Sequence, residues 1–195
     1  MHPWHDSYID DAQIATAFPV VIEIPKGSTN KYELDKETGL LRLDRVLYSA
    51  VYYPADYGFI PRTYCDAEVQ KLSPTSLRGD HDPLDICVLS ERPITRNEIL
   101  VRARVVGGFK MVDSGDADDK IIAVLDNDYI YGSARDIEDL PPVLVERLRH
   151  YFATYKLVPE RHSPVTIERV YNRAHALKVV RAAMVDYDKA FGGRK

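Results

Sequence analysis

Asp80-His81-Asp82-Pro83-Leu84-Asp85 places three carboxylates in six residues, and the apolar run Ile86-Cys87-Val88-Leu89 follows at once. Pro83 removes a backbone donor and favours an extended Asp82, so this stretch is not helical. The apolar run is typical of a buried strand. In an extended segment Asp80 and Asp82 point to the same side, and carboxylates that close repel unless a cation lies between them. Hard oxygen ligands at the entry to a strand therefore predict a site for Mg²⁺ or Mn²⁺.

Two simpler interpretations compete with a functional site. A lone Asp-x-Asp pair is ordinarily a solvated turn. An EF-hand calcium loop needs Gly at its sixth position and Glu at its twelfth, and these positions hold Asp85 and Glu91. Asp85 excludes the EF-hand, and the rest of the chain has to decide between a solvated turn and a working site.

The composition indicates one globular domain. The chain has 195 residues, of which 45% are hydrophobic and 29% are charged, enough for a single core. We predict one domain over 1–195, with an N-terminal arm at 1–17 and a surface insertion at 61–79. The net charge of −4 offers no general basic surface to nucleic acid.

The targeting and cysteine signals favour a reducing cytoplasm. The apolar runs are too short to span a membrane, and the first six residues lack the basic region and apolar core of a signal peptide. Cys65 and Cys87 form no disulfide framework, and no Cys/His cluster has zinc-ligand spacing.

The hydrophobic pattern predicts short strands followed by two helices. The expected strands are Phe18–Ile24, Lys31–Asp35, Leu40–Arg45, Ile86–Leu89, Ile99–Val106, Ile121–Leu125 and Val165–Tyr171. Gly107-Gly108 is expected to break or bulge its strand, and 52–61 to be core plus turn. A second acidic loop spans Asp113–Lys120. Helices are expected from Pro141-Pro142 to about Tyr155 and from about Asn172 to Phe191. This is an α+β domain centred on a barrel.

Several short motifs together resemble a soluble family I inorganic pyrophosphatase, from about Val20 to Lys156. The most specific is Asp80-x-Asp82-Pro83-Leu84-Asp85. The others, in the order of the family, are Glu23, Lys31-Tyr32-Glu33, Asp44-Arg45, Tyr53-Pro54-x-x-Tyr57-Gly58, Lys110-Met111-x-Asp113, Asp118-x-Lys120 and Tyr155-Lys156. Each motif is a weak signal alone, and the resemblance rests on all of them occurring together in the same order as in the family.

The resemblance implies a role for each motif residue. Asp80, Asp85 and Asp118 would bind a tight pair of metals, while Asp113 and Glu23 would help to hold further metals that arrive with the substrate. Asp82 would be the general base on the attacking water. The residues expected to hold the two phosphates are Lys31, Arg45, Tyr57, Lys120, Tyr155 and Lys156. Glu33 and Tyr53 would support them from close by.

The resemblance also implies a fold, cofactors and an assembly. The expected fold is a small closed five-stranded, OB-like barrel with extra strands and two flanking helices. Three to four Mg²⁺ per site are expected, with Mn²⁺ or Zn²⁺ as substitutes and Ca²⁺ as an inhibitor. A homohexamer is expected for a bacterial-type chain of this size. Two features depart from the family pattern: His81 stands where a small residue is usual, and the stretch from Tyr57 to Asp80 is long. We expect His81 to point to solvent.

Pyrophosphate hydrolysis explains why these residue types occur together. Six candidate carboxylates carry about −6, and three or four dications bring roughly +6 to +8. Metals lower the pKa of bound water, Asp82 then removes one proton, and cationic side chains fix the leaving phosphate. The alternatives are an oligonucleotide-binding barrel, a structural Ca²⁺ protein and an enzyme acting on a nucleotide anhydride. The acidic loops count against an oligonucleotide-binding barrel. A structural Ca²⁺ protein would leave the lysines and arginine of the motifs without a task. The sequence has no P-loop or GxGxxG motif, which counts against an enzyme acting on a nucleotide.

Overall fold

The computed structural model of the chain describes residues 1–7, 9–48, 50–157 and 165–192. Its strands are β1 (Phe18–Ile24), β2 (Asn30–Leu34), β3 (Leu41–Val46), β4 (Asp56–Phe59), β5 (Arg78–Gly79), β6 (Asp85–Leu89), β7 (Ile99–Asp113), β8 (Asp116–Ala117), β9 (Lys120–Leu125) and β10 (Val165–Asn172). Its helices are α1 (Asp11–Ile14), α2 (Ala67–Leu72), the 3₁₀ turn η1 (Ile137–Asp139), α3 (Pro142–Thr154) and α4 (Arg173–Phe191).

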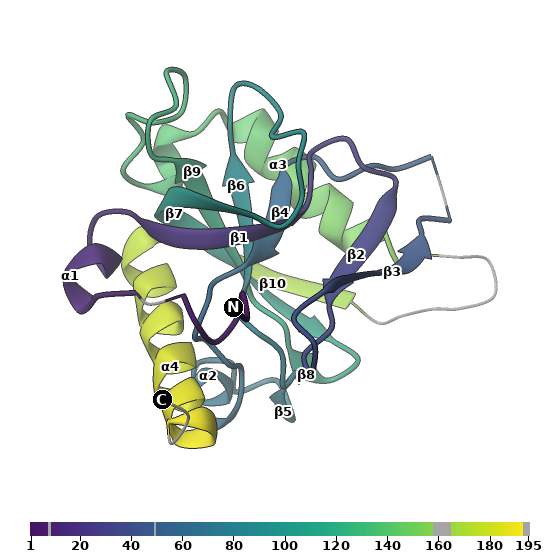
Figure 1. Cartoon of the computed structure of the whole chain (residues 1–195). Coiled ribbons are helices and arrows are strands. Elements are labelled where there is room, and N and C mark those ends of the chain that lie inside the picture. The colour runs from purple at the N-terminus through teal and green to yellow at the C-terminus, as the bar shows by residue number, and fades with distance from the viewer. Residues whose placement is uncertain (8, 49, 158–164, 193–195) are drawn as a thin grey trace.

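Five of these strands close into a barrel. The order is β1-β4-β6-β9-β7, and β7 pairs back onto β1 with Phe18 opposite Ala103. The pairings are antiparallel except for β6 with β9, which run parallel with Asp85 opposite Lys120. Closure leaves these strands without a free edge. The predicted five-stranded, OB-like barrel is confirmed (Figure 1).

Strand β7 is longer than the sequence pattern indicates. It continues through Gly107-Gly108 to Asp113, and the register against β9 shifts between Val105 and Gly107. The bulge is therefore confirmed and the break is wrong. Tyr171 of β10 explains why the glycine is needed, because a Cβ on Gly108 would lie 2.4 Å from its ring. The continuous strand carries the chain from one end of the barrel to the other.

The stretch expected to be core plus turn contains strand β4. A Cβ on Gly58 would lie 1.8 Å from the carbonyl oxygen of Val21, so glycine lets β4 lie against β1. Prolines and glycine hide this strand in the sequence, because they lower strand propensity. Strand β4 places Tyr57 in the barrel wall.

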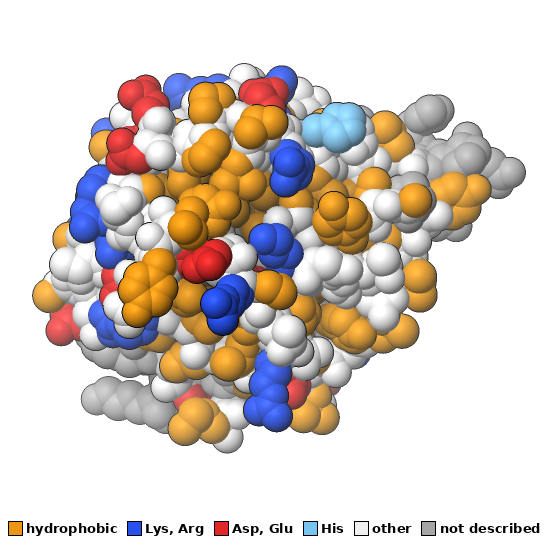
Figure 2. Space-filling model, turned by 90° about the horizontal axis from the view of Figure 1, so that it is seen from above, with side chains coloured by type: hydrophobic (Ala, Val, Ile, Leu, Met, Phe, Trp, Pro, Cys, Tyr) orange, Lys and Arg blue, Asp and Glu red, His pale blue; other side chains and the backbone are white. Residues whose placement is uncertain are grey.

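The predicted hairpin is present as a separate two-stranded sheet. Strands β2 and β3 pair antiparallel, with Lys31 opposite Arg45 and Tyr32 opposite Leu43. The side chain of Asp35 accepts the backbone N–H of Thr38 at 2.8 Å, which fixes the connecting loop. Leu40, Leu43 and Val46 remain exposed on the hairpin. Seen from above, the molecule also shows hydrophobic side chains gathered between Lys and Arg (Figure 2).

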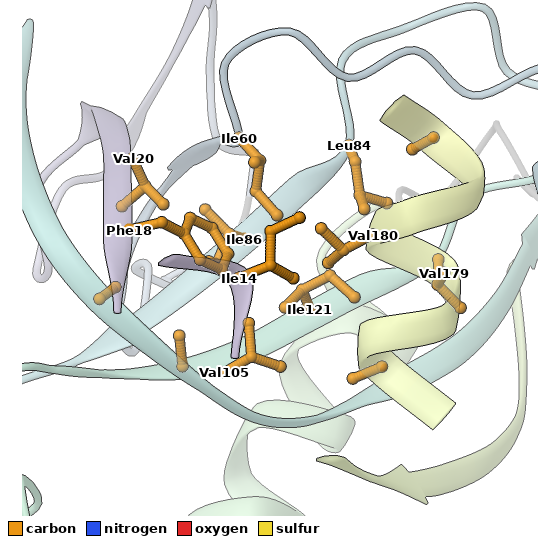
Figure 3. Close-up of a cluster of buried hydrophobic side chains, with 14 of the residues drawn as sticks. Ile14, Phe18, Val20, Ile60, Leu84, Ile86, Val105, Ile121, Val179 and Val180 are labelled. Atoms are coloured by element: carbon orange, nitrogen blue, oxygen red, sulfur yellow. The ribbon is translucent and has the colours of Figure 1, made fainter. Parts of the chain in front are cut away.

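The two long helices cover the barrel, as predicted. Val179 and Val180 of α4 belong to a buried cluster with Leu84, Ile86 and Ile121, and Val180 points toward Ile121 in Figure 3. Leu148 and Phe152 of α3 enter a second cluster, where the ring centroids of Phe152 and Phe109 are 6.3 Å apart. The layers match an α+β fold.

The N-terminal arm packs more tightly than its polar sequence indicates. The arm contains the short helix α1, and Trp4 is only 3% exposed. Its indole N–H donates to the carbonyl of Thr63 at 2.8 Å. The ring also lies 5.1 Å from that of Phe191, between centroids. The arm therefore closes one side of the core.

Residues 61–79 contain a helix that the sequence pattern does not reveal. The buried Asp186 of α4 accepts the backbone N–H groups of Asp66, Glu68 and Val69 at 3.0 Å each, and so caps α2 from another helix. A six-residue helix has too little periodicity to be recognised alone. Its cap comes from 117 to 120 residues away in the chain.

Replacing Asp186 with Ala is expected to lower the free energy of unfolding by about 2–4 kcal/mol, because three buried or part-buried backbone donors lose their shared carboxylate acceptor. Urea denaturation measures the loss. The matched control is Asp188→Ala, two residues along the same helix and exposed, which is expected to change stability by less than about 0.5 kcal/mol. Equal losses in the two variants would contradict this role.

Candidate active site

The predicted site residues converge on one cavity of about 630 Å³. The cavity lies where β6 and β9 begin and β7 ends, beside the β2–β3 hairpin and the end of α3. Its lining includes twelve of the predicted residues: Glu23, Lys31, Glu33, Tyr57, Asp80, Asp82, Asp85, Asp113, Asp118, Lys120, Tyr155 and Lys156. Residues up to 133 positions apart in the chain thus face the same space.

The parallel pairing of β6 and β9 places a cation among the acids. Asp85 is the first residue of β6 and lies opposite Lys120, the first residue of β9. The Lys120 ammonium contacts the carboxylates of both Asp85 and Asp118. Burial alone would lower the pKa of Lys120, but these two carboxylates raise it well above its ordinary value. Lys120 is therefore charged although only 2% of it is exposed.

Asp80 completes a cluster of three acids. Burial raises the pKa of Asp80 well above its ordinary value, and the neighbouring carboxylates of Asp118 and Asp85 raise it further. Burial also raises the pKa of Asp118, against the opposing effect of Lys120. A single ammonium does not fully offset three acids that the fold holds together.

Lysines also contact two further acids of the cavity, Asp113 and Glu33. Lys156 contacts Asp113, and Lys31 contacts Glu33 and lies 3.5 Å from Asp44. These ammonium groups occupy positions beside carboxylate oxygens, as a bound cation would. The cavity is lined by side chains of both signs, which suits a ligand made of cations and phosphate anions.

Asp82, the predicted general base, is half exposed and is contacted by the ammonium of Lys36. Lys36 lies in the loop between β2 and β3 and also reaches the carbonyl of His81 at 3.3 Å. No sequence motif points to Lys36, because its loop has the composition of an ordinary turn. This contact joins the hairpin loop to the acidic loop.

Glu23 is the one charged residue of the otherwise apolar strand β1, and it is buried. Its carboxylate accepts the backbone N–H of Leu34 at 2.8 Å. Burial, with a further contribution from the charge of Asp85, raises its pKa to about 8. Glu23 is thus another acid whose charge needs a nearby cation.

Tyrosines form the apolar wall of the cavity. Burial raises the pKa values of Tyr57 and Tyr155 above the ordinary value, so both hydroxyls are neutral donors. Tyr53 does not line the cavity; its ring stands 5.3 Å from Tyr57 and 5.2 Å from Tyr151, between centroids. Its predicted supporting position fits this packing.

Arg45 is the predicted phosphate ligand that does not line the cavity. Its Nε donates to Asp44 at 2.8 Å, and about half of the side chain is exposed. Arg42, which belongs to none of the sequence motifs, does line the cavity and lies 3.5 Å from Glu33. The bulge between Lys31 and Tyr32 changes the register of the hairpin, and no sequence pattern predicts which arginine faces inward.

The second acidic loop divides between the cavity and the core. Asp113, Asp116 and Asp118 line the cavity, and Asp116 pairs with Arg78 at 2.9 Å. Asp119 turns away and accepts the hydroxyl of Tyr171 at 3.0 Å. A count of acids in the loop does not separate these two roles.

His81 is exposed, as predicted, and its backbone explains why a small residue is usual there. Its φ of 61° lies in the left-handed region, which favours glycine. The ring nitrogen Nδ1 lies 3.1 Å from the hydroxyl of Tyr64, outside the cavity lining. The imidazole ring of His81 therefore does not occupy the acidic cavity.

The donor set of the cavity fits hard divalent cations. Within the described part of the chain, no three acids, histidines or cysteines form a ready-made metal-binding group. The Lys120 ammonium instead lies between Asp85 and Asp118, where it acts as a stand-in cation. Clustered carboxylates with raised pKa values and oxygen-only donors suit Mg²⁺ or Mn²⁺.

A closed barrel of this topology with an acidic, lysine-containing cavity at its strand ends defines an OB-like fold, and comparison with known proteins gives the family. The family model described as inorganic pyrophosphatase matches residues 20–188. The inorganic pyrophosphatase of Chlamydia muridarum is 43% identical over 203 residues, covering 98% of this chain and 96% of its own. The chain therefore belongs to the inorganic pyrophosphatase family.

Solved structures agree with this assignment. The inorganic pyrophosphatase of Thermus thermophilus has a TM-score of 0.81 and 36% identity, covering 96% of this chain and 99% of its own. That of Helicobacter pylori has a TM-score of 0.76 and 38% identity, covering 89% and 95%. In the described residues, no helix has the length and hydropathy needed to cross a membrane.

Replacing Glu23 with Gln is expected to stabilise the metal-free protein at high pH. The folded-state pKa of about 8 lies above the ordinary 4.5, so folding takes up a proton and stability falls as pH rises from 4.5 to 8. The variant lacks this loss and keeps the acceptor for Leu34. Its gain over the parent is expected to be about 2–4 kcal/mol at pH 9 and close to zero at pH 4.5.

Thermal denaturation in EDTA at the two pH values measures the difference. The exposed Glu91→Gln serves as the control and is expected to show no pH-dependent gain. A gain for Glu23→Gln that is the same at both pH values would contradict the raised pKa.

Proposed function

We propose that this protein hydrolyses inorganic pyrophosphate to two orthophosphates with the help of Mg²⁺. The observation that carries the proposal is the convergence of Asp80, Asp85 and Asp118 with the ammonium of Lys120 in one cavity. Such a site suits a doubly phosphorylated ligand that arrives with divalent cations. Membership of the inorganic pyrophosphatase family supports the same reaction.

The acids have the task of holding cations. Asp80, Asp85 and Asp118 are proposed to hold the tight pair, and Asp113 and Glu23 to help with further ions, three to four in all. Bound Mg²⁺ supplies positive charge to the phosphates and lowers the pKa of coordinated water. Mn²⁺ or Zn²⁺ is proposed to substitute for it, and Ca²⁺ to inhibit.

Asp82 is proposed to act as the general base. Its half-exposed carboxylate faces the cavity beside Pro83, and takes one proton from the attacking water. The water oxygen bonds to one phosphorus while the bridging P–O bond breaks, which releases two orthophosphates. Alignment and charge stabilisation supply most of the rate for such phosphoryl transfer.

The cationic and tyrosine side chains are proposed to hold the two phosphates. They are Lys31, Arg45, Tyr57, Lys120, Tyr155 and Lys156. In this structure the ammonium groups of Lys31, Lys120 and Lys156 contact acids. When bound cations neutralise those acids, the same ammonium groups are free to donate to phosphate oxygens. Charged phosphate oxygens are then stronger acceptors than the neutralised carboxylates. Glu33 and Tyr53 support this arrangement through Lys31 and Tyr57.

The wider organisation is also part of the proposal. We propose a single domain over 1–195 that works in the cytoplasm as a homohexamer. Exposed Leu43, Val46 and Tyr52 supply apolar surface of the kind that subunit contacts use. Carboxylates around the cavity disfavour a nucleic-acid partner.

Replacing Asp82 with Asn is expected to lower turnover of pyrophosphate by about 10²–10⁴-fold, because an amide does not accept the proton. Binding of Mn²⁺, followed by titration, is expected to stay close to that of the parent. Asp116→Asn is the matched control, with the same charge change in the same cavity, and is expected to lose far less. Near-normal turnover of Asp82→Asn with Mg²⁺ would contradict the assignment.

Phosphate release tests the reaction itself. With Mg²⁺, pyrophosphate is expected to be cleaved much faster than ATP, because the chain has no nucleotide-reading motif. Excess EDTA is expected to abolish release, and added Ca²⁺ to reduce it. Equal rates on ATP, or full activity in EDTA, would reject the proposal.

A further inference from the structure

Two arginines on β7 have no task in the proposed hydrolysis. Arg102 and Arg104 alternate with Ala103 and Val105, which are at most 1% exposed and face the core. The arginines therefore project from the outer face of the barrel. They lie at the end of β7 far from Asp113, separated by about 30 Å of extended strand.

A second hollow of about 410 Å³ surrounds these arginines. It forms where the α1–β1 connection, β7 and the start of α4 come together (Figure 1). Its lining consists of Ala15, Thr16, Ala17, Arg102, Arg104, Asp126, Arg135 and Arg173. None of these residues lines the acidic cavity.

Backbone carbonyls hold the guanidinium groups in place. Arg102 donates to Ala17 O at 2.7 Å, and Arg173 donates to Ala15 O at 2.6 Å. Arg104 donates to Gly132 O at 2.7 Å, and Arg135 donates to the same oxygen at 3.1 Å. The four side chains are thus oriented before any ligand arrives.

The positive charge of this hollow is only partly compensated, because the carboxylates of Asp136 and Asp139 lie nearby and accept the backbone N–H groups of Arg173 and Arg135 at 3.3 and 2.7 Å. Arg104 pairs with Asp126 at 2.7 Å. Arg102, Arg135 and Arg173 form no ion pair with a carboxylate in the described residues. A neutral carbonyl fixes the position of a guanidinium but does not cancel its charge. Positive charge gathered in a concave surface attracts anions.

Unused donors give the hollow its chemical preference. A guanidinium has five N–H groups, and Arg102 and Arg135 each use one terminal nitrogen for the contacts above. The remaining donors form planar forks, which match the oxygens of a phosphate group. We propose that this hollow, the arginine site, binds a phosphate dianion independently of the acidic cavity. The dianion is either free orthophosphate or the phosphate group of a phosphorylated metabolite.

Equilibrium dialysis of radiolabelled orthophosphate in EDTA tests the site without turnover. The double variant Arg102→Gln/Arg135→Gln is expected to weaken one class of binding by at least about tenfold. That class is expected to survive in Lys31→Met/Lys156→Met, which alters the acidic cavity instead. Unchanged binding in the arginine variant, or complete loss in the lysine variant, would overturn the proposal.

A matched control separates the site from general charge. Arg96→Gln/Arg181→Gln removes the same charge from two exposed arginines elsewhere and is expected to bind orthophosphate as the parent does. An equal loss in this control overturns the proposal. Circular dichroism checks that each variant is folded.

A variant that keeps every arginine tests the same site in another way. Thr16→Glu places a carboxylate in the hollow and is expected to weaken orthophosphate binding about tenfold while raising the melting temperature. Unchanged affinity and stability would count against the site.

Competition with adenosine monophosphate identifies the source of the phosphate group. If adenosine monophosphate displaces the labelled orthophosphate at a concentration below that of orthophosphate, the natural ligand is a phosphorylated metabolite. If it does so only at a higher concentration, the ligand is free phosphate.

Discussion

Repulsion between buried carboxylates is the constraint on which the active site depends. The parallel pairing of β6 and β9 fixes Asp85 beside Lys120, and the turn before β9 brings Asp118 to the same ammonium. Asp80 joins them with its pKa raised by burial and by its acidic neighbours. One lysine offsets only part of the negative charge of these three acids, so the site is expected to bind further cations. The same charge balance leaves the lysines ready for phosphate once those cations bind.

The closed barrel makes such a costly arrangement stable. Strand β7 closes the ring onto β1, and two buried clusters, one containing Phe18 and Ile86 and the other containing Phe109, pack against its strands. Apolar burial at this scale outweighs the cost of holding a few like charges together. The acids themselves lie at strand ends, where the barrel positions their backbone and the loops remain free to carry chemistry. The hairpin adds Lys31 and Lys36 from a separate sheet.

Charges of opposite sign lie at the two ends of the same strands. Strand β9 begins at Lys120 among acids and ends at Leu125, opposite Ala103 between two arginines. At the acidic end, buried carboxylates are close enough to shift each other's pKa values. At the arginine site, backbone carbonyls orient the cations, and among these arginines only Arg104 forms a side-chain ion pair in the described residues. The two ends are therefore suited to cations and to anions respectively.

Local patterns in the sequence determined the barrel strands around Phe18–Ile24 and Ile86–Leu89, the β2–β3 hairpin and both long helices, because side-chain periodicity reflects which face is buried. The motifs also determined most of the residues that line the cavity. Strand β4, helix α2 and the unbroken β7 depended on tertiary contacts: Gly58 against Val21, Asp186 against the start of α2, and Gly108 against Tyr171. Only the tertiary structure placed Lys36 and Arg42 at the cavity and Arg45 outside its lining. The physical reason is that hairpin register and long-range caps arise from partners distant in the chain, which no local pattern specifies.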